Sequence, residues 1–317
     1  MRVLVTGGAG FIGSSVVDRL LADGHTVTAF DNLSTGRPEF LAEAQRGPFR
    51  LVVGDLLDIA TLQRAIDGHD LVIHLAANAD VRGGLNHPRR DLEQNTIVTQ
   101  NVLEAMRQSG VSRICFSSTG SIYGEPTQFP TPEDCPFPVQ TSLYGASKLA
   151  AEGLISAYCH GFGFRALIFR FVSILGPRYT HGHVLDFYNK LRADPTRIEV
   201  LGNGRQRKSY LHIRDCVEAI VCALESVSEP YQVLNLGTDA TCTVDESLSW
   251  ICEELGVAPV REYTGGARGW AGDSPLIHLD CTRMRRLGWR PRHTIRESVI
   301  DTLQYLCASP ATAGQKH

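Results

Sequence analysis

The chain has 317 residues, of which 43% are hydrophobic and 21% are charged, and its formal net charge is −3 at pH 7. This is the composition of an ordinary globular protein, and the charge gives no reason to expect a nucleic acid or an anionic membrane as a partner. No apolar run approaches the ~20 residues that cross a bilayer. The first expected strand follows Met1 directly, so we expect a cytoplasmic protein without a signal peptide.

Cysteines and histidines give no sign of a disulfide or a metal site. The nine cysteines are scattered and include no C-x-x-C pair. His181 and His183 are the only close pair of histidines, and no carboxylate pattern accompanies them. We therefore expect neither disulfides nor a bound metal.

An apolar run at residues 2–5 is followed by glycines at positions 7, 10 and 13, and then by a helical apolar stripe at 14–21. Strand, glycine turn and helix in this order indicate a dinucleotide-binding site rather than an ordinary βαβ unit. Gly7 should allow the tight turn, Gly10 the close approach of a pyrophosphate, and Gly13 the packing of the helix against the strand. The free amides at the start of the helix would then face the phosphates.

A second expected strand, residues 25–30, ends at Asp31. An acidic residue about 20 positions after the glycines is placed to accept the ribose hydroxyls of the adenosine, and it repels a 2′-phosphate. The sequence therefore favours NAD as the cofactor. NADP is the alternative, because Arg37 follows closely in the sequence.

The first half of the chain continues to alternate strands and helices with short connections. This alternation predicts an α/β fold with a parallel, doubly wound sheet. Asp55, just after the third strand, should bond the adenine amino group or cap the next helix. Further strands are expected at 49–53, 70–77, 113–117 and 164–171, and helices at 59–66, 95–106 and 144–160.

The alternation loosens after the sixth strand, so we place a domain boundary near residue 173. Residues 1–172 should form the dinucleotide-binding domain, with a return of the chain to it near 210–238. Residues 173–310 should mainly form a smaller, mixed α/β domain that binds the substrate, before a disordered tail at 311–317. The elements expected here are helices at 185–192, 215–226 and 244–255, strands at 198–201, 209–213 and 231–236, and a mostly helical stretch at 281–306.

Three hydroxyl residues, Ser117, Ser118 and Thr119, end the fifth expected strand, and the next helix begins with Tyr144 and Lys148. A spacing of four puts Tyr144 and Lys148 on one helical face. The pKa of a tyrosine, near 10, must fall by about three for the phenol to act as a base at neutral pH, which takes roughly 4 kcal/mol. A lysine cation at about 4 Å supplies about 4 kcal/mol at an effective dielectric constant of ~20, and the positive nicotinamide of NAD+ adds to it. The sequence therefore predicts a base beside the cofactor.

Tyr144 and Lys148, together with the N-terminal glycine pattern, resemble the signature of the extended short-chain dehydrogenase/reductase family. Within this family the chain is most similar to nucleotide-sugar 4-epimerases of the UDP-glucose (UDP-galactose) type. The resemblance implies a Rossmann sheet with a smaller substrate-binding domain. It extends over nearly the whole chain, through Gly54-Asp55-Leu56, His74 to Ala77, Gly176-Pro177-Arg178, Gly202-Asn203-Gly204 and Arg268 to Asp273.

The resemblance also implies a mechanism. Tyr144 would remove the proton from the sugar 4-hydroxyl while C4 gives hydride to NAD, and Thr119 would hydrogen-bond the same oxygen. Lys148 would hold the nicotinamide ribose. The 4-keto sugar would turn over in the pocket and take the hydride back on its other face, so NAD would be recycled and stay bound.

The residues after Thr119 help to choose among related reactions. Related 4,6-dehydratases carry Asp-Glu where this chain has Gly120 and Ser121, and decarboxylating relatives use a nearby glutamate that is also missing. Epimerisation needs neither. The alternatives are a 4-epimerase of UDP-glucuronate or UDP-N-acetylglucosamine, an NAD(P)-dependent nucleotide-sugar dehydratase or reductase, and a non-enzymatic dinucleotide sensor.

The resemblance and the strand-end positions together imply the residues of the site. Those expected to bind the cofactor are Gly7, Gly10, Phe11, Ile12, Gly13, Asp31, Asn32, Ser34, Thr35, Gly36, Asp55, Leu56, Leu75, Ala76, Ala77, Asn95, Ser117, Tyr144 and Lys148. Those expected to bind the UDP-sugar substrate are Ser118, Thr119, Ser121, Tyr144, Ser173, Arg178, Val184, Lys208, Arg268 and Asp273. A homodimer is also implied, formed by a four-helix bundle of the helices at 95–106 and 144–160.

Three positions depart from the pattern of the family. Lys208 replaces a phosphate-binding arginine, which exchanges a bidentate fork for a point charge. Ser173 replaces a substrate-binding asparagine. Ile277 stands where a bulky aromatic or a small residue often controls access for the sugar 2-substituent, so N-acetylated sugars stay among the possible substrates.

Overall fold

A parallel sheet of seven strands forms the centre of the computed structural model, which describes residues 1–136 and 139–309. In this described part the strands follow the order β11-β6-β5-β4-β1-β2-β3, and all neighbours run parallel. The prediction of a doubly wound α/β Rossmann sheet is confirmed. The strands are β1 Arg2–Thr6, β2 Thr26–Asp31, β3 Phe49–Val53, β4 Leu71–His74, β5 Arg113–Thr119, β6 Arg165–Phe171 and β11 Tyr231–Leu236.

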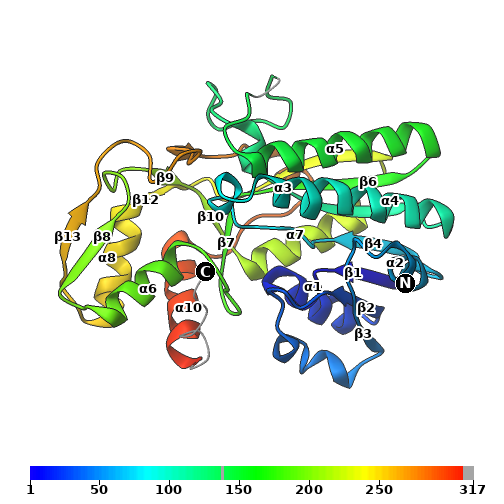
Figure 1. Cartoon of the computed structure of the whole chain (residues 1–317), viewed down its shortest axis with the longest axis horizontal. Coiled ribbons are helices and arrows are strands. Elements are labelled where there is room, and N and C mark those ends of the chain that lie inside the picture. Colours follow the sequence, from blue (N-terminus) through cyan, green and yellow to red (C-terminus); the bar gives the residue numbers. More distant parts are fainter. Residues whose placement is uncertain (137–138, 310–317) are drawn as a thin grey trace.

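Helices cover both faces of the sheet, as Figure 1 shows. On one face, Ile66, Val102 and Ile155 of three helices share a buried apolar cluster with Leu4 and other strand residues. These helices are α2 (Ile59–Ile66), α4 (Val98–Gln108) and α5 (Leu143–Phe162), and the opposite face carries α1 (Phe11–Ala22) and α7 (Ile213–Ser226).

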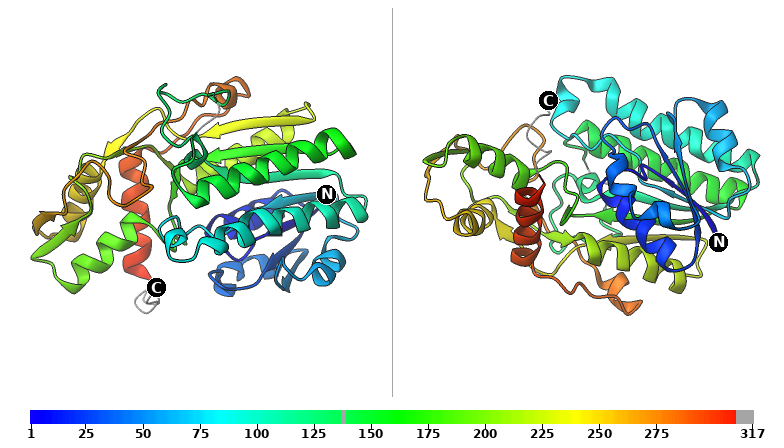
Figure 2. Two further views of the ribbon diagram at one scale, coloured as in Figure 1. Left: turned by 45° about the horizontal axis from the view of Figure 1, so that its top comes forward. Right: turned by 90° about the horizontal axis from the view of Figure 1, so that it is seen from below.

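A smaller lobe of short sheets and helices lies beside the central sheet (Figures 1 and 2). The chain enters it just after β6, near residue 173, whereas β11 lies back in the central sheet next to β6. A division into two domains at this point stays a prediction. The strands of the lobe are β7 (Ser173–Leu175), β8 (Arg197–Val200), β9 (Arg207–Lys208), β10 (Tyr210–His212), β12 (Cys242–Thr243), β13 (Val260–Tyr263) and β14 (Leu276–Ile277), and its helices are α6 (His183–Ala193), α8 (Val244–Leu255) and α10 (Ile295–Ala308).

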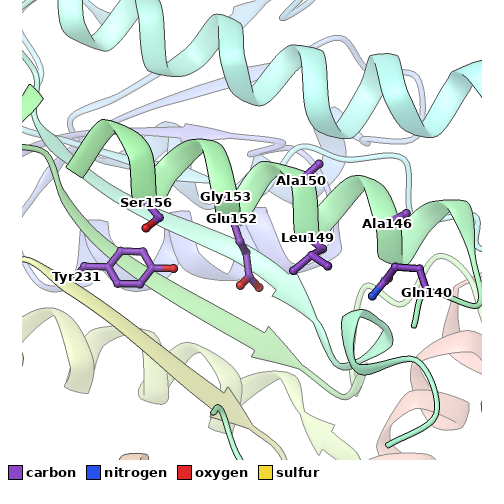
Figure 3. A pocket seen from close by; sticks show the side chains of 8 residues that line it. All are labelled: Gln140, Ala146, Leu149, Ala150, Glu152, Gly153, Ser156 and Tyr231. Carbon is purple, nitrogen blue, oxygen red and sulfur yellow. The ribbon is translucent and has the colours of Figure 1, made fainter. Parts of the chain in front are cut away.

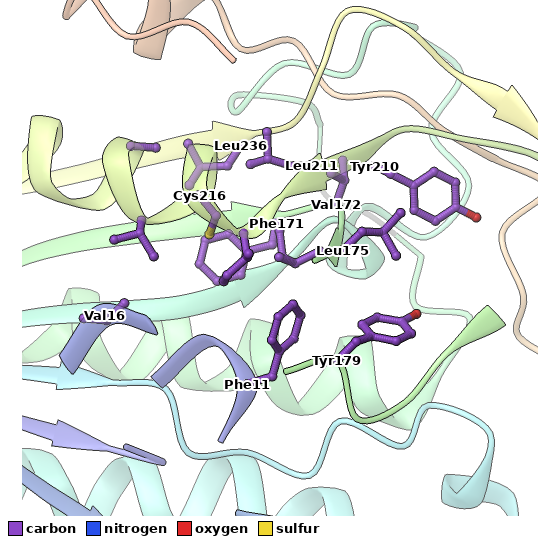
Figure 4. Close-up of a cluster of buried hydrophobic side chains, with 14 of the residues drawn as sticks. Phe11, Val16, Phe171, Val172, Leu175, Tyr179, Tyr210, Leu211, Cys216 and Leu236 are labelled. Carbon is purple, nitrogen blue, oxygen red and sulfur yellow. The ribbon is translucent and has the colours of Figure 1, made fainter. Parts of the chain in front are cut away.

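A buried cluster joins the two parts of the molecule near the start of α1 (Figure 4). The ring of Phe11 meets the ring of Tyr179 edge-on, with centroids 5.7 Å apart. Val172, just before β7, Leu175 of β7 and Leu211 of β10 belong to the same cluster. The segment that follows β7 is therefore packed against the glycine turn.

One expected helix differs from the structure. The helix expected at 95–106 begins earlier, as α3 (Pro88–Asp91), and passes through a π-helical turn, η4 (Leu92–Ile97), into α4. Pro88 is well suited to the first helical position. The stretch 281–306 is mostly helical, as expected, and it consists of α9 (Thr282–Arg286) and α10, separated by a segment that contains Gly288, whose φ is +91°, and Pro291. The disordered tail expected at 311–317 lies outside the described residues.

One capping role was assigned to the wrong residue. Asp58, not Asp55, caps α2, and its carboxylate accepts a hydrogen bond from the Thr61 amide at 3.2 Å. Asp55 instead accepts from the Leu57 amide at 2.9 Å. In residues 1–136 and 139–309, no helix is both long and apolar enough to cross a bilayer.

Candidate active site

The glycine turn between β1 and α1 is tightly packed. Gly7 has a φ of +67°, and a Cβ there would lie 2.8 Å from the backbone nitrogen of Ala76, in the segment after β4. A Cβ on Gly13 would collide with the carbonyl oxygen of Gly7. Gly10 precedes α1 without any capping side chain, so the first amides of the helix are left for an anionic ligand.

Asp31 lies at the carboxyl end of β2, next to this turn. Its carboxylate accepts hydrogen bonds from the amides of Leu33, at 2.8 Å, and Ala9, at 2.9 Å. Burial raises the pKa of Asp31, and these two hydrogen bonds oppose that rise. A Cβ on Gly36 would lie 2.7 Å from the carboxylate, so Gly36 packs directly against Asp31 and a side chain there would collide with it.

The neighbouring strand end brings further predicted cofactor residues together. The Nδ2 of Asn32 donates to the Oδ2 of Asp55 at 3.2 Å, across the ends of β2 and β3. The Oδ1 of Asn32 accepts from the Ser34 amide at 3.0 Å. The ends of β1, β2 and β3 thus form one continuous edge, from the glycine turn to Asp55.

Tyr144 and Thr119 meet at the carboxyl end of β5. The two side chains are hydrogen-bonded to each other. Thr119 Oγ1 also accepts from the Ser121 amide at 3.1 Å. A Cβ on Gly120 would lie 3.5 Å from Ile277 Cγ2, so Ile277 lies next to the residue that follows Thr119.

The pKa values of Tyr144 and Lys148 differ from those that the sequence predicted. Burial raises the pKa of Tyr144 to about 12, and the hydrogen bond from Thr119 only partly offsets it. Burial also lowers the pKa of Lys148 to about 7, opposed by the nearby carboxylate of Glu152. The Lys148 ammonium lies 4.5 Å from the centre of the Phe116 ring. Loss of hydration is the largest influence on the pKa of each group, and Lys148 is not among the groups that lower the pKa of Tyr144.

Asn95, which is predicted as a cofactor residue, links three segments of the chain. Its Oδ1 accepts from the Asn78 amide at 2.9 Å, and its Nδ2 donates to Ser147 Oγ at 2.9 Å. Asn78 follows β4, and Ser147 precedes Lys148 on α5. The π-helical turn directs this side chain inward, and such turns often occur at functional sites.

His74 is a buried residue at the end of β4. The sequence analysis included it in the stretch that resembles the family but predicted no role for it. Its Nδ1 lies 2.7 Å from Thr6 Oγ1, and its Nε2 lies 3.1 Å from Thr99 Oγ1. Since the Thr99 hydroxyl donates to the carbonyl of Asn95, Nε2 must carry the proton and Nδ1 must accept. Burial lowers the pKa of His74 to about 3, so a neutral imidazole of fixed tautomer holds the segment that touches Gly7.

Three of the predicted substrate residues come together in the smaller lobe. Lys208 Nζ lies 2.5 Å from Asp273 Oδ1, and Arg268 donates to the carbonyl of Asp273 at 3.1 Å. Arg268 also pairs with the carboxylate of Glu125.

Two further residues of this cluster, Arg82 and Trp270, were not predicted. The Arg82 guanidinium and the Lys208 ammonium lie over the Trp270 ring, at 4.4 and 4.9 Å from its centre. Arg82 belongs to the segment after β4, far from Trp270 in the sequence. Only the tertiary fold brings the two residues together.

Other predicted substrate residues are not in this cluster. The Arg178 guanidinium lies 2.7 Å from Asp18 on α1. Val184 is fully buried in the core, and Ser173 is exposed at the start of β7. The buried hydroxyl of Ser118 has no hydrogen-bond partner among the described residues.

A glycine turn and an acidic strand end at one edge of a parallel Rossmann sheet, with Tyr144 and Lys148 nearby, define a dinucleotide-binding class of protein. Residues 3–237 match the NAD dependent epimerase/dehydratase family, and the chain belongs to that family. The residues present fit the dinucleotide, since no side chain caps the start of α1 and Asp31 stands at the end of the neighbouring strand.

Named relatives span nearly the full length of the chain. It is 34% identical to a UDP-glucose 4-epimerase of Mycolicibacterium smegmatis, over 96% of this chain and 98% of the relative. Among solved structures, it resembles a UDP-galactose 4-epimerase with a TM-score of 0.88 at 39% identity, covering 97% of this chain and 99% of that one. It also resembles the UDP-glucose 4-epimerase of Thermus thermophilus in complex with NAD, with a TM-score of 0.86 at 33% identity, covering 98% and 100%.

Proposed function

We propose that this protein is an NAD-dependent nucleotide-sugar 4-epimerase that interconverts UDP-glucose and UDP-galactose through a transient 4-keto sugar. The observation that carries the proposal is the hydrogen-bonded pair of Thr119 and Tyr144. It stands at the same sheet edge as the glycine turn and Asp31, where ligands of open α/β sheets bind. The relatives named as UDP-glucose 4-epimerases support the choice of sugar.

The chemistry divides between the cofactor and the chain. Bound NAD supplies the acceptor, and then the donor, of the hydride at C4. Tyr144 takes the proton from the 4-hydroxyl and returns it, and Thr119 holds the same oxygen. Bringing the Tyr144 pKa from about 12 to near 7 takes about 7 kcal/mol. The positive charge of the oxidised nicotinamide ring, together with a charged Lys148, is the source we propose.

The surroundings of Thr119 favour epimerisation over elimination of water. Gly120 and Ser121 follow it, and Ser121 is hydrogen-bonded to Thr119 itself at 3.2 Å. Neither residue can remove a C5 proton and expel a C6 hydroxyl, because that work needs a titratable acid and base. Simple epimerisation needs only the Tyr144 proton transfer and the hydride.

The direct test is incubation of the purified protein with UDP-galactose without added NAD, followed by chromatography. We expect UDP-glucose to form, with no lasting change in absorbance at 340 nm. A stoichiometric change at 340 nm would instead identify a net oxidoreductase. UDP-glucuronate, UDP-N-acetylglucosamine and the corresponding dTDP sugars in parallel reactions give the substrate range.

We also propose a homodimer, formed through α4 and α5. The outer face of α5 carries the small residues Ala150 and Gly153, both exposed, and Ile97 and Phe162 at its borders are 38% and 55% exposed. A groove of about 590 Å³ runs along α5 beside Tyr231 (Figure 3), and neither Tyr144 nor Lys148 lines it. Light scattering after size-exclusion chromatography tests this, and a monomer at micromolar concentration would contradict it.

The cytoplasm is the compartment we propose. All nine cysteines are free, as is usual for proteins of reducing compartments. Localisation of a tagged full-length chain by microscopy or fractionation tests this proposal.

A further inference from the structure

Three cations belong to the cluster around Trp270 and Asp273, and each is paired with a carboxylate. Arg82 lies 3.1 Å from Asp186 on α6, Lys208 lies 2.5 Å from Asp273, and Arg268 pairs with Glu125. Arg82 differs from the other two because it comes from the segment after β4, in the dinucleotide-binding part of the chain. It therefore crosses between the two parts of the molecule.

Trp270 lies between the two nearest of these cations. The Arg82 guanidinium is 4.4 Å and the Lys208 ammonium 4.9 Å from the centre of its ring. Its indole Nε1 is buried and has no hydrogen-bond partner among the described residues. Burial, followed by the charges of Lys208 and Arg82, lowers the pKa of His183 to about 3, so both cations face the same interior wall.

The two ion pairs nearest Trp270 differ in exposure. The side chains of Arg82 and Asp186 are 45% and 43% exposed, whereas those of Lys208 and Asp273 are 14% and 3% exposed. Exposed pairs are weak and easily exchanged, and breaking a buried pair leaves an uncompensated charge. An incoming anion would therefore take Arg82 from Asp186 and leave Lys208 with Asp273.

We infer that Arg82 is a diphosphate-binding residue of the substrate site, and that Asp186 competes with the substrate for it. This inference rests on the proposed function, which supplies the nucleoside diphosphate. An arginine fork can bind phosphate oxygens in a bidentate, charge-assisted way. Trp270 holds the guanidinium over its face, so the side chain has less freedom to lose when the phosphate arrives.

Competition by Asp186 predicts opposite effects for its two partners. Arg82→Gln should weaken UDP binding about tenfold or more, which is typical for the loss of a hydrogen bond to a charged group. Asp186→Asn should tighten UDP binding about two- to fivefold, as the modest value of an exposed ion pair allows. In the double variant, Asp186→Asn should no longer increase the affinity for UDP, because Asp186 acts on UDP binding only through Arg82.

The test is isothermal titration of the purified enzyme, with its NAD, using UDP and then uridine as the probes. Uridine has no phosphate, so its affinity should not change in any variant. Arg89→Gln is the matched control, since Arg89 lies nearby in the sequence on α3, is 84% exposed and pairs with Glu93 one helical turn away. Equal melting temperatures of all variants show that the chain is intact.

The outcomes distinguish a failure of the proposed function from a failure of the role of Arg82. Wild-type protein that neither binds UDP nor epimerises UDP-galactose overturns the proposed function together with this inference. Wild-type protein that does both, with Arg82→Gln within twofold of it, overturns only the role of Arg82. If Asp186→Asn weakens UDP binding, Asp186 positions Arg82 rather than competing for it, and the inferred competition is wrong.

Discussion

The Arg178 guanidinium lies 2.7 Å from the carboxylate of Asp18, so the segment after β7 is tied to the outer side of α1. Arg178 adopts a φ of +71°, a left-handed conformation that costs a non-glycine residue about 1 kcal/mol or more. Its side chain thereby points towards α1 and the Phe40 ring, 6.0 Å away. This is a connection between the two lobes at the rim of the glycine turn.

Replacement of Arg178 by Met should therefore reduce stability rather than substrate affinity. Loss of the guanidinium leaves Asp18, which is 30% exposed, without its partner, and we expect a loss of about 1–2 kcal/mol in the free energy of unfolding. Urea unfolding measures this loss. UDP affinity, measured by titration, should stay within about twofold of wild type, and a tenfold loss would instead support direct phosphate binding by Arg178.

Replacement of Tyr144 by Phe should abolish most of the epimerisation. Removing a positioned general acid–base group typically costs about 10²- to 10⁴-fold in rate, and Thr119 cannot accept the proton at neutral pH. Initial rates with UDP-galactose check this. Tyr158→Phe is the matched control on the same helix, where the hydroxyl contacts Gln100 at 2.8 Å. Near wild-type turnover by the Tyr144 variant would remove this residue from the mechanism.

Burial of Lys148 should give the stability of the NAD-free protein a defined pH dependence. The pKa of Lys148 falls from 10.5 to about 7 on folding, so between these values the unfolded chain binds more protons and stability rises with pH. Below pH 7, burying the charged lysine lowers the free energy of unfolding by its full amount, at most about 5 kcal/mol.

The variant Lys148→Met should therefore be more stable than wild type at pH 6.5, and this advantage should shrink towards pH 10. Urea unfolding of both proteins at pH 6.5, 8.5 and 10 measures the difference. The pair of Glu152 and Arg170 stays intact in the variant, since two hydrogen bonds of 3.1 and 2.7 Å join them. An advantage that is the same at every pH would show that the lysine is not titrating in this range.

The substitution Gly13→Ala should release NAD. The new Cβ would collide with the Gly7 carbonyl, so the glycine turn must move and its amides lose alignment with the phosphates. We expect at least about a tenfold loss of NAD affinity, because more than one hydrogen bond to a charged group is disturbed. Titration of the apo protein with NAD measures it. Gly161→Ala on α5 has open space around it and should bind NAD as wild type does.

Most of the central sheet was predictable because its signals are local. Residues 49–53 and 244–255 were expected as a strand and a helix with the bounds that β3 and α8 have. Buried parallel strands are continuous apolar runs, and helices have clear caps, such as the capping box of Thr243 and Glu246. The π-helical turn before α4 has no comparable signal, because it depends on the partners that Asn95 finds on other segments.

The site was predictable where its residues are close in the sequence. The spacing of Tyr144 and Lys148 and the three glycines follow from single segments. Trp270 meets Arg82 only because distant loops fold together, and the direction of Arg178 depends on its left-handed backbone. The raised pKa of Tyr144 is likewise a property of its surroundings, which the sequence does not contain.

The position of β11 has a consequence for taking the molecule apart. This edge strand is made by chain that has already passed through β7 to β10, so a fragment ending near residue 173 would lack it. Seven hydrogen-bonded strands would become six, and β6 would present an unpaired edge, which favours aggregation. A fragment that ends near residue 173 is therefore not expected to be self-sufficient, and an exchange of the smaller lobe between relatives would require more than one crossover point.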